Sequence, residues 1–140
     1  MAEVFAGFVS GYILALVFTA LAAVMIVGAR SRIPYLAKAI APNISAAALT
    51  VPISLIAFLI WTAIGMVLGL LYRGAEDQAP GGGLGSPNLL YTLVIALTGA
   101  FILTLVAALW RRLPWQVAVM ALTSVAVFGW AMPYLAQAAK

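Results

Sequence analysis

The chain has 140 residues, of which 66% are hydrophobic and only 7% are charged, and its formal net charge at pH 7 is +4. Charged residues fill about a quarter of an ordinary water-soluble domain, so this composition excludes that class. Cysteine and histidine are both absent, which excludes disulfides, thiolate nucleophiles and the commonest metal ligand.

Four long stretches of the sequence contain no charged residue. They are Val4–Gly28, Ala39–Tyr72, Leu89–Trp110 and Leu113–Ala139. Each is long enough to cross a hydrocarbon core of about 30 Å as an α-helix, and none alternates in polarity as the strand of a membrane barrel does. We therefore predict an all-α integral membrane protein whose four transmembrane helices form an antiparallel bundle of two helical hairpins. Residues 1–140 form a single domain in this interpretation, with helices over about residues 4–27, 45–71, 88–109 and 114–135.

Small residues recur at every fourth position of the first predicted helix, and a second group lies near the end of the second predicted helix. Membrane helices associate by close van der Waals packing, which small side chains permit. The pattern predicts a helix-packing surface, either between these two helices or toward another protein. Its members are Gly7, Gly11, Ala15, Thr19, Thr62, Gly65 and Gly69.

Residues 73–87 are rich in glycine and proline, which predicts an irregular connector. Within this segment, Glu76 and Asp77 lie close to Arg73 and are interpreted as solvated charges and not as an acid–base pair. Asn88 directly follows the connector and is the predicted cap of the third helix.

A proline near the end of the fourth helix and the hydroxyl side chains inside the helices allow two further predictions. Pro133 predicts the end of the fourth helix. Serine and threonine inside the helices can either line a polar pore or bond to their own backbone one turn earlier, and their scattered positions favour the second interpretation. The residues concerned are Ser10, Thr19, Ser54, Thr62, Thr98, Thr104 and Thr123.

Basic residues are distributed unevenly between the connectors. Five of them fall between the first and second or the third and fourth predicted helices, whereas Arg73 and Lys140 are the two on the other side. Positive charge marks the cytoplasmic side, so both termini and residues 73–87 are predicted to lie outside a prokaryotic-type inner or plasma membrane. The predicted membrane-interface residues are Arg30, Arg32, Arg111, Arg112, Trp110 and Trp115.

The sequence contains no recognisable catalytic or metal site, because no base accompanies any serine and no cluster of metal ligands occurs. Ion-coupled transporters keep an ionisable group inside the membrane, and the four charge-free stretches have none. We predict a non-enzymatic accessory or structural subunit of a larger energy-transducing, transport or secretion complex. The alternative is a small homo-oligomeric channel or carrier for a neutral or lipophilic solute.

The expected partners are the lipid bilayer and either other membrane subunits or further copies of the chain, and no nucleic acid. No cofactor is evident from the residues. Aromatic side chains such as Trp61 leave a pigment, a quinone or a lipid open as ligands, because all three bind to apolar and aromatic surfaces.

Overall fold

The computed structural model describes residues 1–32, 45–78, 88–109 and 115–140, and all regular structure in these ranges is helical. The elements are α1 (Ala2–Arg32), α3 (Ala46–Gln78), α4 (Leu89–Leu109), α5 (Trp115–Ala126), the π-helical segment η1 (Val127–Ala131) and α6 (Met132–Ala138). The last three follow one another without a break and form one helical rod. The described residues contain four helices that are long and apolar enough to cross a membrane, as the sequence predicted.

α3 is longer than predicted, since it continues past Leu71 to Gln78. Arg73, Glu76 and Asp77 therefore lie on a helix, and their assignment to an irregular connector was wrong. The physical reason is that arginine, alanine and glutamate favour helix, so that the helix continues past Leu71 through these residues. Residues 79–87, which hold most of the glycine and proline, lie outside the described ranges.

The predicted helix end at Pro133 was also wrong, because the chain stays helical through this proline to Ala138. Proline has no backbone N–H and leaves the carbonyl four residues earlier without its helical donor. That carbonyl belongs to Gly129, and the hydroxyl of Thr92 on α4 donates to it over 3.0 Å. A π-helical turn, η1, occupies the segment just before the proline. The neighbouring helix thus supplies the donor that proline lacks.

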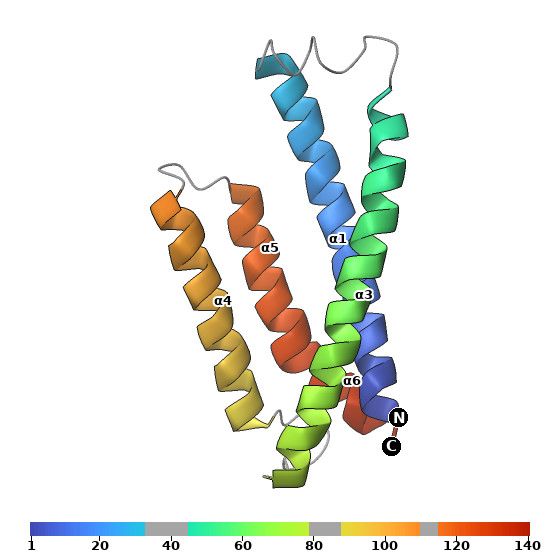
Figure 1. Cartoon of the computed structure of the whole chain (residues 1–140), viewed down its shortest axis with the longest axis vertical. Coiled ribbons are helices and arrows are strands. Elements are labelled where there is room, and N and C mark those ends of the chain that lie inside the picture. The colour runs from blue at the N-terminus through green and yellow to red at the C-terminus, as the bar shows by residue number, and fades with distance from the viewer. Residues whose placement is uncertain (33–44, 79–87, 110–114) are drawn as a thin grey trace.

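Two ends of the molecule can be distinguished in Figure 1. We call one the terminal end, where the helices meet Met1, Gln78, Asn88 and Lys140. We call the other the arginine end, where the helices meet Arg32, Ser45, Leu109 and Trp115.

α1 and α3 run antiparallel and lie against each other, whereas α6 packs against the first half of α1 (Figure 1). α4 contacts mainly α5 and η1. α4 and α5 diverge from the α1–α3 pair toward the arginine end (Figure 1). The four long helices are therefore joined closely at the terminal end only.

The buried core lies in the terminal half of the molecule. Tyr72 of α3, Leu14 of α1 and Met132 of α6 are fully buried. The rings of Tyr72 and Tyr91 meet edge to face, with centroids 5.1 Å apart. The Tyr91 hydroxyl points to the sulfur of Met132, 3.8 Å away. Side chains from all four long helices meet in this core, which fixes their relative positions there.

Candidate functional site

The α1–α3 interface brings the predicted small residues of the two helices together. A Cβ atom added to Gly7 would collide with the carbonyl group of Gly65, since it would lie 2.7 Å from the carbonyl carbon. A Cβ on Gly11 would lie 2.8 Å from Cα of Thr62, and one on Gly69 would lie 2.9 Å from the carbonyl carbon of Glu3. The backbones therefore touch over about two turns of helix, which only glycine allows.

The interface continues beyond the glycines toward the arginine end. Ala15 and Thr62 are buried, with 3% and 4% of their surfaces exposed, and Thr19 is half-buried. All seven residues of the predicted packing surface thus lie on the α1–α3 pair, and their glycines contact the partner helix of the same chain. The sequence alone had left open whether these small residues pack against the other helix of the chain or against a second protein.

Hydroxyl groups inside the helices bond mainly to their own backbone, as predicted. The Thr19 hydroxyl donates to the carbonyl of Ala15 at 2.8 Å, and Thr98 does the same to Val94. Local bonds of this kind hold Thr19, Ser54, Thr62, Thr98, Thr104, Thr123 and Ser124. Ser10 differs, because its buried Oγ has no hydrogen-bond partner among the described residues.

A polar cluster joins three helices at the terminal end. The Lys140 ammonium lies 3.4 Å from Oε1 of Glu3 and also pairs with the carboxylate of Glu76. The Tyr72 hydroxyl donates to Oε1 of Glu76 at 3.0 Å and accepts a bond of 3.2 Å from the Gln137 amide. Glu3 is only 7% exposed. Glu76 is thus a structural partner of Lys140 and Tyr72, whereas Asp77 is exposed.

The Lys140 side chain is about half exposed, yet its surroundings favour the charged form. The hydrogen bond to Glu76 is the largest of the causes that raise the pKa of Lys140 above its ordinary value of 10.5, and the partial burial of the ammonium opposes it. Lys140 therefore stays protonated throughout the neutral range, and its ion pairs persist there.

Asn88 caps α4, as its position predicted. Its side-chain oxygen accepts a bond of 3.2 Å from the backbone N–H of Tyr91. Its amide nitrogen also donates to the carbonyl of Ala75 on α3 at 3.2 Å. The second bond ties α3 to α4 at the terminal end, which no local sequence signal indicated.

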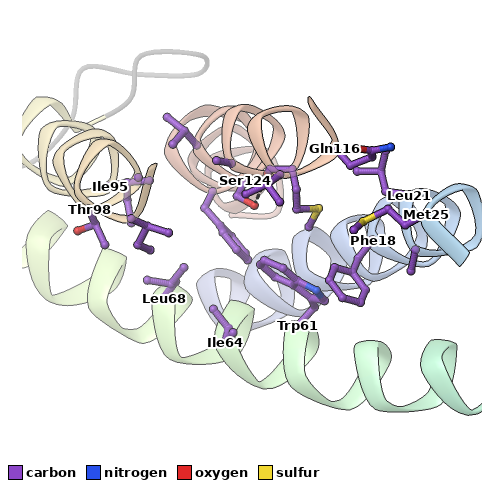
Figure 2. A pocket seen from close by; sticks show the side chains of 18 residues that line it. Phe18, Leu21, Met25, Trp61, Ile64, Leu68, Ile95, Thr98, Gln116 and Ser124 are labelled. Atoms are coloured by element: carbon purple, nitrogen blue, oxygen red, sulfur yellow. Dashed lines mark hydrogen bonds between the residues drawn. The ribbon is translucent and has the colours of Figure 1, made fainter. Parts of the chain in front are cut away.

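An apolar cleft of about 500 Å³ lies between the α1–α3 pair and the α4–α5 pair (Figure 2). Each helix contributes residues at helical spacing, such as Phe18 and Met25 on α1 and Trp61 and Leu68 on α3. On α5 the lining runs from Gln116, in the first turn at the arginine end, to Ser124. The cleft is therefore elongated along the helices.

The cleft offers few polar groups. Its polar lining consists of Thr98, Gln116, Ser124 and the indole N–H of Trp61. The hydroxyls of Thr98 and Ser124 already donate to carbonyls of their own helices. Gln116 lies at the edge of the cleft nearest the arginine end (Figure 2). The cleft thus suits a hydrocarbon chain or ring and not a hydrated solute.

Aromatic rings line the middle of the cleft, which continues past Trp61 to Leu68 of α3. The ring of Trp61 stacks on Phe128 with centroids 6.3 Å apart, and Phe18 lies against the other side of Trp61 at 6.2 Å. Phe128 is only 4% exposed. Trp61 is therefore the residue at which the cleft, α1 and η1 meet.

The predicted membrane-interface residues are only partly described. Arg30 and Arg32 lie on the last turn of α1, and Trp115 is the first residue of α5 and 59% exposed. Trp110, Arg111 and Arg112 lie outside the described residues. Among the described residues, Arg30 and Arg32 of α1 therefore lie at the same end of the molecule as Trp115 of α5.

Sequence reasoning missed both the polar cluster and the cleft. The spacing of Tyr72 and Glu76, four residues apart, would have indicated their contact had the helix been extended far enough. Within the described ranges, no group of three or more acidic residues is arranged to hold a metal ion. Comparisons with protein families, curated proteins and solved structures found no match.

Proposed function

We propose that this chain is a non-catalytic integral membrane protein that holds a lipophilic molecule in the cleft between its two helical hairpins. The observation that carries this proposal is the apolar cleft of about 500 Å³. Ligand sites in proteins commonly enclose about 300–1,000 Å³ and are lined by apolar and aromatic side chains with few polar groups. The lining described above has this character.

Membrane insertion is part of the proposal and is supported by the outer faces of the helices. Leu59 of α3 and Leu97 and Phe101 of α4 are 66%, 68% and 64% exposed. Water is a poor solvent for such surfaces, whereas lipid chains solvate them at no cost. The uneven distribution of arginine and lysine supports an orientation with both termini and the α3–α4 connection outside.

The test of binding uses the full chain purified in a mild detergent, with bound small molecules extracted and identified by mass spectrometry. Ala121→Phe places a ring in the cleft, because Ala121 lines it. Ala126→Phe is the matched control, since Ala126 is exposed on the same helix. We expect a lipophilic molecule to co-purify with the wild type and with Ala126→Phe, and to be lost from Ala121→Phe. Equal recovery from all three proteins would refute the proposal.

The orientation is tested by cysteine labelling in intact cells. Ser31→Cys reports on the arginine end, and Asp77→Cys reports on the terminal end, where Asp77 is exposed. An impermeant thiol reagent should label Asp77→Cys only. Labelling of Ser31→Cys alone would reverse the orientation.

A second candidate function is that of an accessory or structural subunit in a larger energy-transducing, transport or secretion assembly. The exposed face of α4 favours it, because this helix contacts few residues of its own chain. Such an apolar face can pack on a partner subunit as well as on lipid. Cross-linking from a photoreactive group at Leu97 distinguishes the two: specific adducts with another membrane protein support this candidate, and adducts with lipid alone oppose it.

A homo-oligomeric channel lined by hydroxyl groups has less support. Its pore would need free hydroxyl donors, and those of Thr98, Thr104 and Thr123 are already bonded to their own helices. We expect no proton or potassium flux from proteoliposomes that contain the chain alone. Flux abolished by Thr98→Val or Ser124→Ala would instead promote the channel.

A further inference from the structure

We propose that the occupant of the cleft is an acyl chain of an anionic phospholipid whose phosphate group lies at the arginine end. This inference rests on the proposed function and names the class of ligand that the cleft selects. It depends on the direction of the cleft, on the chemistry of its two ends, and on the charge beside the arginine end.

The cleft runs along the helices, in the direction that a lipid chain takes in a bilayer. Gln116, Met120, Ser124 and Phe128 lie along one face of the α5–η1 rod. Twelve residues separate the first from the last, which corresponds to a length of about 18 Å. A chain-like ligand fits a cleft of this length better than a compact solute.

The two ends of the cleft differ in chemistry. Toward the core, its lining is wholly apolar and ends at Leu68 of α3 and Ile95 of α4. Toward the arginine end, Gln116 places an amide at its edge, beside Met25 and Leu21 of α1 (Figure 2). A hydrocarbon tail therefore points toward Leu68 and Ile95, and a polar headgroup points toward Gln116.

The charge of the arginine end complements an anionic headgroup. Arg30 and Arg32 lie on the last turn of α1 at this end. The described residues at this end, in the last turn of α1 and the first turn of α5, include no acidic residue.

The terminal end has the opposite balance, with Glu3, Glu76 and Asp77 against Arg73 and Lys140. Basic residues at a membrane surface attract anionic lipids, and each contributes measurably to the affinity. A zwitterionic lipid or a neutral isoprenoid quinone would gain less from Arg30 and Arg32.

The experiment is a native mass spectrometry titration of the full chain, delipidated in a mild detergent. The probes are phosphatidylglycerol and phosphatidylcholine with identical acyl chains, together with a neutral isoprenoid quinone. We expect one phosphatidylglycerol per chain, bound about tenfold more tightly than phosphatidylcholine. The double variant Arg30→Gln/Arg32→Gln should lose this preference. Arg73→Gln, exposed at the opposite end, should keep it.

The cleft itself is tested by the pair Ala121→Phe and Ala126→Phe in the same titration. Ala121→Phe should abolish the single high-affinity site, and Ala126→Phe should not. If Ala121→Phe abolishes binding but the two lipids bind equally, or if the quinone binds best, the headgroup inference is overturned and the proposed function survives. If Ala121→Phe changes nothing, both are overturned.

A fluorescence measurement tests the cleft in a chain that does not carry Ala121→Phe. Misfolding of that variant therefore cannot affect the result. In a chain whose other tryptophans are replaced by phenylalanine, Trp61 reports on the middle of the cleft. Phosphatidylglycerol brominated on its acyl chains should quench Trp61 at low mole fraction in phosphatidylcholine nanodiscs. Brominated phosphatidylcholine at the same fraction should quench it much less, and equal quenching by both would contradict the inference.

Discussion

The α1–α3 and α4–α5 pairs both have glycine at their contacts, but the neighbours of these glycines differ. Gly7 and Gly65 meet the backbone of the opposite helix. A Cβ added to Gly99 would collide with the Cγ2 methyl of Val125, and one added to Gly129 would lie 3.7 and 3.9 Å from side-chain atoms of Ile95 and Thr92. Small residues four apart on both helices bring backbones together, whereas an isolated glycine only receives a side chain from its partner. The α1–α3 contact therefore cannot adjust to an added methyl group, whereas the contacts at Gly99 and Gly129 can.

The largest effect should follow from an added methyl group in the α1–α3 contact. Gly65→Ala forces the backbones of α1 and α3 apart and should lower the free energy of unfolding by about 1–3 kcal/mol. Gly74 on the same helix has open space around its Cα, so Gly74→Ala should be neutral or slightly stabilising because alanine favours helix. Thermal unfolding in detergent measures both, and shifts of the same sign and size would contradict this view of the contact.

The next effect concerns the hydrogen bond that joins α4 to η1. Thr92→Val removes the donor to the Gly129 carbonyl, which Pro133 also leaves without a donor, and should cost about 1 kcal/mol. Thr98→Val is the matched control on α4, since its hydroxyl bonds only to its own helix. Unfolding midpoints that agree within error would show that the cross-helix bond contributes nothing.

A smaller effect is expected for a methyl group in the α4–α5 contact. Gly99→Ala meets the Cγ2 methyl of Val125 and no backbone atom, and turning this β-branched side chain away from its preferred rotamer costs about 1 kcal/mol. The higher helix propensity of alanine offsets a similar amount. The unfolding midpoint of Gly99→Ala should therefore lie near that of the wild type, in contrast to that of Gly65→Ala. A loss as large as that of Gly65→Ala would show that both contacts are equally fixed.

The smallest effect is expected for Lys140→Gln, which removes ion pairs of a half-exposed side chain. Surface pairs contribute no more than about 1 kcal/mol. Because the pKa of Lys140 is raised in the folded state, its contribution is complete below the ordinary value of 10.5 and is lost as the pH rises through the higher folded value. Wild type and variant should differ by a constant amount between pH 6 and pH 9 and converge at higher pH. Convergence within the neutral range would contradict the raised pKa.

The sequence predicted those features that depend on local composition and helical spacing. The four apolar helices follow from the charge-free stretches, and the residues of the α1–α3 contact follow from their four-residue spacing. The cap at Asn88 and the local bonds of hydroxyls such as Thr98 involve partners within one turn.

Features with distant partners could not be predicted in this way. Pro133 is accommodated by Thr92, which lies on another helix. Glu76 is held by Lys140, far along the chain. The cleft depends on the angle between two helix pairs, and no single residue encodes that angle.

The joining of the long helices at the terminal end has a mechanical consequence. A helix of twenty residues is about 30 Å long, so a tilt of roughly 5° at the joined end moves its far end by about 2–3 Å. Small changes in the contacts around Tyr72 and Met132 are thereby magnified at the arginine end. The distance between the far ends of α1 and α5 is consequently sensitive to such changes. A pair of spin labels placed there would measure how widely the two helix pairs are spread in bilayers of different thickness.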